Sequence, residues 1–154
     1  MSYTDENLFE FRFAQLTDLS NQAANLLSSL GYQKGDRIML LLSKTVEIFA
    51  FFLGALKLGL VSSILFTSIG EDSIVERIKD TDTRAIISTS RMNFRLVKVL
   101  QKLDNSFRVL LVDEDRSDGQ FVGIHEQFKQ ASVEFVTPET DPEQYSHFHF
   151  TSGS

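Results

Sequence analysis

The last residues of the chain combine a strand-like pattern with a turn whose groups could bind phosphate. Phe148 and Phe150 alternate with His147 and His149, and this period of two predicts a β-strand. The tetrapeptide that follows offers three hydroxyl groups and unobstructed backbone N–H groups to an anion. The same composition is also typical of an ordinary or disordered terminal turn, which is the alternative interpretation. The candidate phosphate-binding residues are Thr151, Ser152, Gly153 and Ser154.

The two histidines of this segment could also bind a metal ion, because His147 and His149 would point to the same face of a strand. A zinc site needs three or four protein ligands, however, and the chain has no cysteine and only His125 as a further histidine. The acidic loop over residues 113–119 is compatible with Ca²⁺, but its spacing does not match an EF-hand, and a solvated loop explains it better. We therefore predict no metal site, and we assign no catalytic residue within the chain.

Composition limits the partners that the protein could bind. The 154 residues include 15 basic and 21 acidic side chains, which give a formal net charge of −6, and no cluster of lysine and arginine offsets it. Nucleic acids and anionic membranes attract proteins of the opposite charge. We therefore expect small-molecule substrates or another protein as partners, and neither nucleic acid nor a membrane.

Cysteine usage and the first residues bear on the cellular setting. The absence of cysteine excludes disulfides and thiolate chemistry and suits a reducing compartment. The first residues lack the basic start and apolar middle of a signal peptide, so we expect a cytoplasmic protein. A hydrophobic content of 42% is enough for one core, and residues 1–154 should form one domain or one piece of a larger domain.

One apolar stretch, residues 46–66, has the length of a membrane span. Glu47 and Lys57 interrupt it, and the apolar residues between them are far fewer than the roughly 20 that a bilayer needs. Gly59 is placed to end a helix inside the stretch. A buried helix followed by a buried strand is the better interpretation.

Hydrophobic spacing predicts an alternation of helices and strands along the chain. Ser43 is placed to cap the second helix, which is apolar on nearly all sides and should be buried on several of them. Glu71 and Asp72 mark the start of a short third helix. The other predicted helices span residues 14–30, 45–58, 93–103 and 124–131, and the predicted strands span residues 37–42, 60–66, 84–88, 108–112 and 146–151.

This alternation of helices with continuous apolar strands specifies an α/β fold, with a mostly parallel sheet and helices on both faces. Ligands of such sheets bind at the carboxyl ends of the strands. The turn Thr151–Ser154 follows the last predicted strand. The predicted fold and the predicted phosphate site therefore point to the same edge of the sheet.

Five segments carry recognisable motifs in a characteristic order. The first three are Phe11-Arg-Phe-Ala-Gln-Leu16, Leu26-Leu-Ser-Ser-Leu-Gly31 and Lys34-Gly-Asp-Arg-Ile38. The other two are Gly54-Ala-Leu-Lys-Leu-Gly59 and Phe150-Thr-Ser-Gly-Ser154. Together they resemble the start of the AMP-forming acyl-CoA synthetases of the adenylate-forming superfamily. The fourth is similar to the family's Leu-Lys-Ala-Gly segment, and the fifth to the opening of its phosphate loop, which in relatives continues Thr-Gly-x-Pro-Lys-Gly.

Within this superfamily, residues 64–74 and 148–154 look most like the acetyl-CoA synthetase branch. The chain departs from the family at two positions: Ile64 stands where relatives usually carry proline, and Arg12 stands where they usually place Ser or Thr to cap the first helix. A lost cap costs about 1 kcal/mol, so Arg12 affects local stability. Neither position touches the chemistry that the resemblance implies.

The resemblance implies a reaction in which a carboxylic acid and ATP form an acyl-adenylate and pyrophosphate, followed by transfer of the acyl group to CoA. The full-length enzyme would use ATP, Mg²⁺ and CoA, and its acid would be acetate or another short acyl acid. Thr151–Ser154 would contact the β- and γ-phosphates through backbone N–H and hydroxyl groups, and Gly153 would allow close approach. Residues 1–154 would be the N-terminal part of the AMP-binding (adenylation) domain and would end inside the phosphate loop.

A chain that ends there is expected to be inactive by itself and to bind none of these cofactors tightly. It should self-associate through an exposed sheet edge, because Ser146–Thr151 would belong to a sheet whose remaining strands come from later residues. The alternative is a non-catalytic α/β interaction or dimerisation module derived from the same family. A flavodoxin-like or Rossmann nucleotide binder is disfavoured, because no Gly-x-Gly-x-x-Gly follows the strand over residues 38–42.

Overall fold

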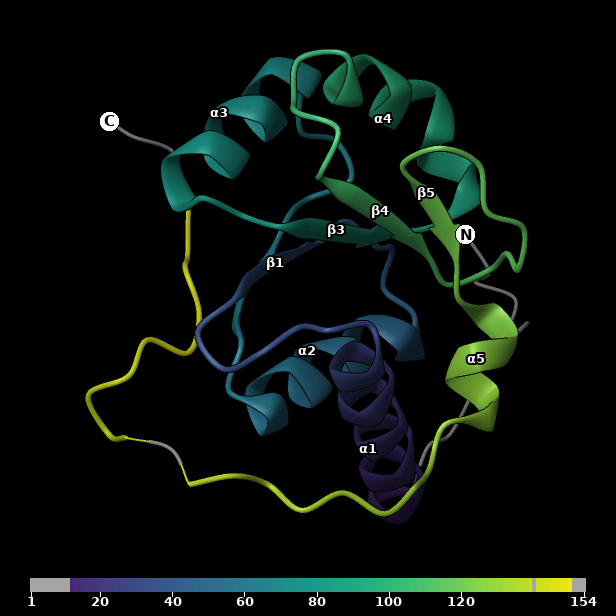
Figure 1. Ribbon diagram of the computed structural model, residues 1–154, viewed down its shortest axis with the longest axis vertical. Helices are drawn as coiled ribbons and strands as arrows, with labels where there is room; N and C mark the ends of the chain where they lie inside the picture. Colours follow the sequence, from purple (N-terminus) through teal and green to yellow (C-terminus); the bar gives the residue numbers. More distant parts are fainter. Residues whose placement is uncertain (1–11, 140, 151–154) are drawn as a thin grey trace, which may run out of the picture.

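A five-stranded sheet forms the centre of the protein (Figure 1), whose computed structural model describes residues 12–139 and 141–150. The strands lie in the order β2-β1-β3-β4-β5, and all neighbours are parallel. The strands are β1 (Arg37–Leu40), β2 (Val61–Ile64), β3 (Ala85–Ser88), β4 (Arg108–Leu111) and β5 (Phe121–Gly123). The helices are α1 (Phe13–Ser29), α2 (Val46–Leu58), α3 (Glu71–Thr81), α4 (Asn93–Leu100) and α5 (His125–Gln130), with a 3₁₀ turn η1 (Ser90–Met92) before α4.

Helices cover both faces of this sheet. α1, α2 and α5 lie on one face, and α3 and α4 lie on the other (Figure 1). Because successive strand residues point to opposite faces, Leu40 packs with α1 and α2, whereas Met39 and Leu41 pack with α3 and α4. The prediction of an α/β fold with a parallel sheet and helices on both faces is confirmed.

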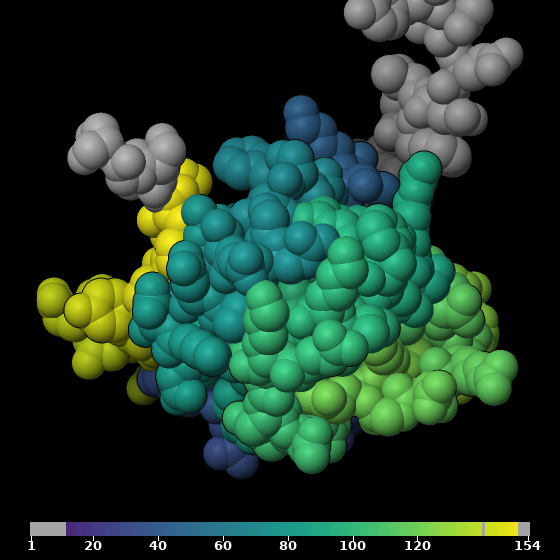
Figure 2. Space-filling view, turned by 90° about the horizontal axis from the view of Figure 1, so that it is seen from above, coloured from purple at the N-terminus to yellow at the C-terminus, as the bar shows by residue number. Residues whose placement is uncertain are grey.

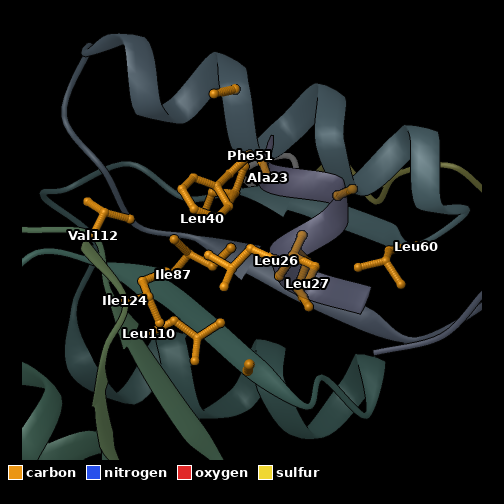
Figure 3. Packing of buried hydrophobic residues seen from close by; sticks show 14 of the residues in the cluster. Ala23, Leu26, Leu27, Leu40, Phe51, Leu60, Ile87, Leu110, Val112 and Ile124 are labelled. Carbon is orange, nitrogen blue, oxygen red and sulfur yellow. The ribbon is translucent and has the colours of Figure 1, made fainter. Parts of the chain in front are cut away.

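The larger of the two cores lies between the sheet and the pair formed by α1 and α2. Figure 3 shows Phe51 of α2 in this core beside Leu40 of β1 and Ala23 of α1. The two helices approach closely at Gly54, where a Cβ atom would lie 2.6 Å from the Cβ of Ala23 and 2.8 Å from the carbonyl oxygen of Ser20. Glycine at this position therefore permits the contact between the two helices.

α1 begins without the Ser or Thr cap that relatives usually carry. Its N-cap residue is Arg12. The Oε1 atom of Gln15 accepts a hydrogen bond of 2.9 Å from the backbone N–H of Arg12, which is one half of a capping box. A different side chain thus satisfies the N-cap backbone at this helix end.

α2 has nearly the predicted bounds but different surroundings. Gly59, with φ of 79°, ends the helix as predicted. The prediction that Ser43 caps the helix is wrong: the N-cap is Thr45, whose N–H donates to the carbonyl oxygen of Ser43 at 2.8 Å. Burial on several sides is confirmed only in part, because α2 packs against both α1 and the sheet, whereas Phe49 on its outer side is 57% exposed.

Other differences concern short elements. β5 is absent from the prediction because its three residues are too few for a periodic pattern. α4 ends at Leu100, three residues before the predicted end at residue 103. The strand predicted over residues 146–151 forms only one bridge among the described residues, between Ser62 and His147.

The connector after α5 is bound along α1. Asn21, Gln22 and Asn25 of α1 donate side-chain N–H groups to backbone carbonyl oxygens within residues 129–134, over distances of 2.7–3.1 Å. In Figure 1 the chain then passes beneath α1 and α2 and turns up toward α3. The bridge between Ser62 and His147 places its end at the β2 edge of the sheet. The α1 amides therefore hold the first part of the connector. Among the described ranges, no helix is both long and apolar enough to cross a membrane.

Candidate phosphate-loop site

The terminal segment lies alongside β2 at the edge of the five-stranded sheet. The N–H of Ser62 donates to the carbonyl oxygen of Ser146 at 3.1 Å, and the N–H of Phe148 donates to the carbonyl oxygen of Ser62 at 3.0 Å. These bonds form the parallel bridge between Ser62 and His147. The segment therefore runs in the same direction as β2 and occupies the position of a sixth strand.

The register of this bridge brings the segment to the carboxyl edge of the sheet. Counting three residues onward from Ser62 and from His147 pairs Leu65 with Phe150, and Leu65 directly follows β2. Phe150 packs against the core between the sheet and the pair of α3 and α4, and that core contains Leu65. The candidate residues Thr151, Ser152, Gly153 and Ser154 come next and lie outside the described residues, so their role stays a prediction.

Two side chains from other elements hold the end of the segment. The hydroxyl of Ser63 on β2 donates to the carbonyl oxygen of Phe148 at 3.0 Å. The guanidinium of Arg77 on α3 lies 4.7 Å from the centroid of the Phe150 ring. Figure 2 shows the last described residues, in yellow, beside the teal surface of α3. Residues 63 and 77 thus contact the chain just before the candidate turn.

Sequence reasoning missed both contacts. Arg77 lies far from Phe150 in the sequence, and no local pattern links a helix arginine to a distant ring. A weak signal exists for the strand, because Ser62 and Ser63 are buried hydroxyl residues within an otherwise apolar run. Buried hydroxyls need partners, and the Ser63 Oγ finds its partner in the terminal segment.

The loop after β2 lies at the same edge and is fixed by Arg95 of α4. The guanidinium of Arg95 donates to the carbonyl oxygens of Thr67 and Ile69. Its Nε also pairs with the Oε1 of Glu71 at 3.3 Å. The backbone N–H of Glu71 itself, followed by Arg95, lowers the pKa of the Glu71 carboxyl below its ordinary value. Residues 67–71 are therefore tied to α4 at the carboxyl edge of the sheet.

The carboxylates of the acidic loop after β4 accept hydrogen bonds from residues that lie nearby in the fold. Asp113 accepts hydrogen bonds from the N–H and the hydroxyl of Ser90, at 2.8 and 2.7 Å. Asp115 accepts one from the N–H of Glu126 at 2.6 Å. These carboxylates therefore position η1 and the start of α5.

The structure does not bring the three histidines together. His147 belongs to the segment at the β2 edge, whereas His125 follows β5 at the opposite edge. The Nδ1 of His125 lies 2.8 Å from the carbonyl oxygen of Val112. Within residues 12–139 and 141–150, no group of three or more His, Cys, Asp or Glu side chains could hold a metal ion. For the whole chain the absence of a metal site stays a prediction.

The strand order 2-1-3-4-5 defines a doubly wound α/β domain, a class that binds its ligands at the carboxyl edge of the sheet. Flavodoxin-like proteins share this order, so the order alone does not separate the alternatives. The family model of the AMP-binding enzymes matches residues 5–154. The chain belongs to the AMP-binding enzyme family.

Similar proteins agree with this membership. An acetyl-coenzyme A synthetase of Bacillus subtilis is 26% identical over 147 residues, covering 94% of this chain and 25% of the relative. The human mitochondrial acyl-coenzyme A synthetase ACSM2B is 29% identical over 152 residues, covering 94% of this chain and 25% of the relative. The crystal structure of an acyl-CoA synthetase from Brucella canis superposes with a TM-score of 0.87 and 26% identity, covering 97% of this chain and 27% of that one.

These matches confirm the resemblance to AMP-forming acyl-CoA synthetases. The chain spans about a quarter of the length of the relatives it matches.

Proposed function

We propose that residues 1–154 are the N-terminal part of the AMP-binding domain of an ATP-dependent, AMP-forming carboxylate–CoA ligase. One observation supports the proposal: parallel pairing with Ser62 directs Phe150 to the carboxyl edge of the sheet, which is the edge where such sheets bind ligands, and Thr151–Ser154 are the next residues in the chain. Family membership supports it. Acetate or another short acid is the proposed substrate, because acetyl-coenzyme A synthetases recur among the relatives.

In this proposal the candidate turn binds the β- and γ-phosphates of ATP. Backbone N–H groups and the three hydroxyls donate to phosphate oxygens, and Gly153 lets a phosphate approach the backbone closely. A carboxylate oxygen of the acid attacks the α-phosphorus, the bond to pyrophosphate breaks, and an acyl-adenylate forms. The thiol of CoA then attacks the acyl carbon and AMP leaves. Mg²⁺ would neutralise phosphate charge in the complete enzyme.

Residues 1–154 alone should have no measurable adenylation activity and should bind ATP only weakly. No lysine or arginine follows Lys129, and residues 130–154 instead contain acidic side chains at positions 134, 139, 141 and 143. A highly charged triphosphate would therefore meet hydroxyl and N–H groups without a cation from this part of the chain. Loss of one pre-placed electrostatic group typically lowers a rate about 10²–10³-fold.

ATP–pyrophosphate exchange with acetate and Mg²⁺ tests this function. We would compare the 154-residue chain with a chain extended through complete catalytic and C-terminal domains, and we expect exchange only from the extended chain. Exchange by the 154-residue chain above a no-protein blank would contradict its inactivity. An extended chain that is folded but inactive would overturn the ligase proposal.

Two matched serine substitutions in the extended chain test the candidate turn. Ser152→Ala removes a proposed phosphate donor and should slow exchange by about tenfold or more. Ser146→Ala is the control, because the hydroxyl of Ser146 contacts only the Nδ1 of His147 among the described residues, at 3.1 Å. Equal exchange rates for Ser152→Ala and Ser146→Ala would mean that the hydroxyl of Ser152 does not bind phosphate.

A non-catalytic interaction module is the second candidate function, and exposed apolar side chains favour it. Phe49 on the outer side of α2 is 57% exposed, and Ile64 and Phe66 at the end of β2 are 47% and 77% exposed. Exposed apolar surface and an open strand edge promote association. We therefore propose that the 154-residue chain self-associates.

Size-exclusion chromatography with light scattering tests self-association. The apparent mass should rise with concentration, and Phe49→Glu should lower it if the outer side of α2 takes part. A monomer at all concentrations, together with a cooperative melt, would contradict the proposal.

A cytoplasmic location is part of the same proposal. The cysteine-free composition suits a reducing compartment. Fractionation of cells that express the whole protein would test it, and recovery in a secreted fraction would contradict it.

A further inference from the structure

We propose that Arg77 and Ser63 are positioning residues that hold Phe148 and Phe150, the part of the terminal segment that directly precedes the candidate phosphate-binding residues Thr151–Ser154. Ser63 holds the backbone of the terminal segment, and Arg77 holds its last described side chain. We call these two contacts the β2–α3 clamp. The effect of the clamp on ATP binding rests on the proposed ligase function. The clamp itself can be tested whether or not that function is correct.

Backbone pairing alone leaves the end of the segment weakly fixed. Among the described residues, its backbone hydrogen bonds to the sheet end at the N–H of Phe148, which donates to Ser62. The hydroxyl of Ser63 adds one bond, to the carbonyl oxygen of Phe148. Phe150, two residues further on, is held by its side chain, which packs against the core beneath α3 and α4. The placement of Phe150, the last described residue, therefore depends on that side chain.

The guanidinium of Arg77 lies over the ring of Phe150 and is not held in an ion pair with another described residue. Some arginines of the fold form ion pairs, such as Arg84 with Asp36 at 2.8 Å and Arg95 with Glu71 at 3.3 Å. Within residues 12–139 and 141–150, the guanidinium of Arg77 makes no ion pair. It lies instead 4.7 Å from the ring centroid, within the range of a cation–π contact.

The same contact places a positive charge next to Phe150, the residue before the candidate turn. Thr151 directly follows Phe150, and the chain carries no lysine or arginine after Lys129. A guanidinium that contacts a ring through its face keeps its N–H donors at the edge of the plane. Arg77 thus contributes a cation from α3 at a place where the terminal residues themselves carry none.

Hydrogen exchange at the amide of Phe148 in the 154-residue chain measures the clamp directly. Loss of a cation–π contact at a partly exposed site should lower the protection of this amide about two- to fivefold in Arg77→Ala. Lys79→Ala is the matched control, because it removes a cation from the same helix at an exposed position. Arg77→Lys retains the charge and should restore most of the protection. Equal protection in Arg77→Ala and Lys79→Ala would overturn the clamp.

A double-mutant cycle separates the ring contact from a general effect on α3. Phe150→Leu keeps an apolar side chain but removes the ring, so Arg77→Ala should cause no further loss of protection in that background. An undiminished loss would overturn the cation–π contact. If Arg77→Ala lowers the stability of the whole fold, the double-mutant cycle still decides, because a general loss would be the same in the wild-type and Phe150→Leu backgrounds.

Kinetics of the extended chain test the consequence for ATP. Arg77→Ala should raise the KM for ATP severalfold and leave the KM for acetate unchanged, whereas Lys79→Ala should change neither. Unchanged ATP kinetics in Arg77→Ala would overturn the functional part of the proposal. An inactive extended wild-type chain would refute the proposed ligase function instead, and the exchange protection of Phe148 would still decide whether the clamp exists.

Discussion

Replacing Phe51 with alanine should remove a central side chain of the larger core. Phe51 is fully buried, and its ring centroid lies 4.9 Å from that of Phe128 on α5, with an angle of 38° between the ring planes. A Phe→Ala change in a core costs about 3–5 kcal/mol, of which the aromatic pair accounts for about 0.5–1.5 kcal/mol. Because small domains are stable by only about 5–15 kcal/mol, Phe51→Ala should remove a large part of the stability.

Urea melts followed by circular dichroism measure this loss as a change in the free energy of unfolding. Phe49→Ala is the matched control, because it removes the same side chain from the same helix at a position that is 57% exposed, and it should cost about 0.5 kcal/mol or less. Phe52 packs against the core in part, so Phe52→Ala should fall between the two. A loss below about 1 kcal/mol for Phe51→Ala, or equal losses for Phe49→Ala and Phe51→Ala, would refute the packing of α2 on the sheet.

Three other changes test helix contact, connector binding and electrostatics. Gly54→Ala should lower the free energy of unfolding by about 1–3 kcal/mol in urea melts, because the new Cβ would lie 2.6 Å from a side-chain Cβ of α1. Asn25→Ala should speed cleavage of the connector in limited proteolysis, because the Asn25 Nδ2 donates to two carbonyl oxygens within residues 132–134, at 2.8 Å each. Asp72→Asn should make stability less sensitive to acid, as thermal melts between about pH 5 and pH 2 would show. The hydrogen bond from Lys102, followed by its charge, lowers the pKa of Asp72 below the ordinary value of 3.8. Since the folded pKa is the lower one, this stabilisation is complete above pH 3.8 and is lost as the pH falls through the folded pKa.

Each of these expectations has a contrary result. A neutral or stabilising Gly54→Ala would mean that α1 and α2 lie further apart than described. Cleavage of Asn25→Ala at the wild-type rate would mean that the α1 amides do not hold the connector. An unchanged acid dependence in Asp72→Asn would mean that the exposed pair with Lys102 is screened by solvent.

Local patterns in the sequence were sufficient to predict most of the elements. Strand β3 follows from a short apolar run, and the end of α2 follows from Gly59, because a residue with positive φ at a helix end favours glycine. The alternation of helices and strands then predicts a parallel sheet with two covered faces. The family motifs are likewise read from neighbouring residues, and the match over residues 5–154 confirms them.

Other features have no local signal. The exposure of Phe49 depends on which elements lie over α2. When a helix is apolar on nearly all sides, its sequence does not show which side faces solvent. β5 is too short to form a period, and its pairing with β4 comes from the fold around it. Thr45 rather than Ser43 is the N-cap of α2, and both residues are types that favour this position.

The sequence by itself determined the family and most of the alternating elements, because each depends on residues that are close together in the chain, and it predicts a phosphate-binding turn at Thr151–Ser154. Only the tertiary structure decided that the segment before this turn pairs with Ser62 and that Arg77 lies over Phe150. These contacts join residues far apart in the sequence. Their energies depend on register and distance, which hydrophobic periodicity does not specify.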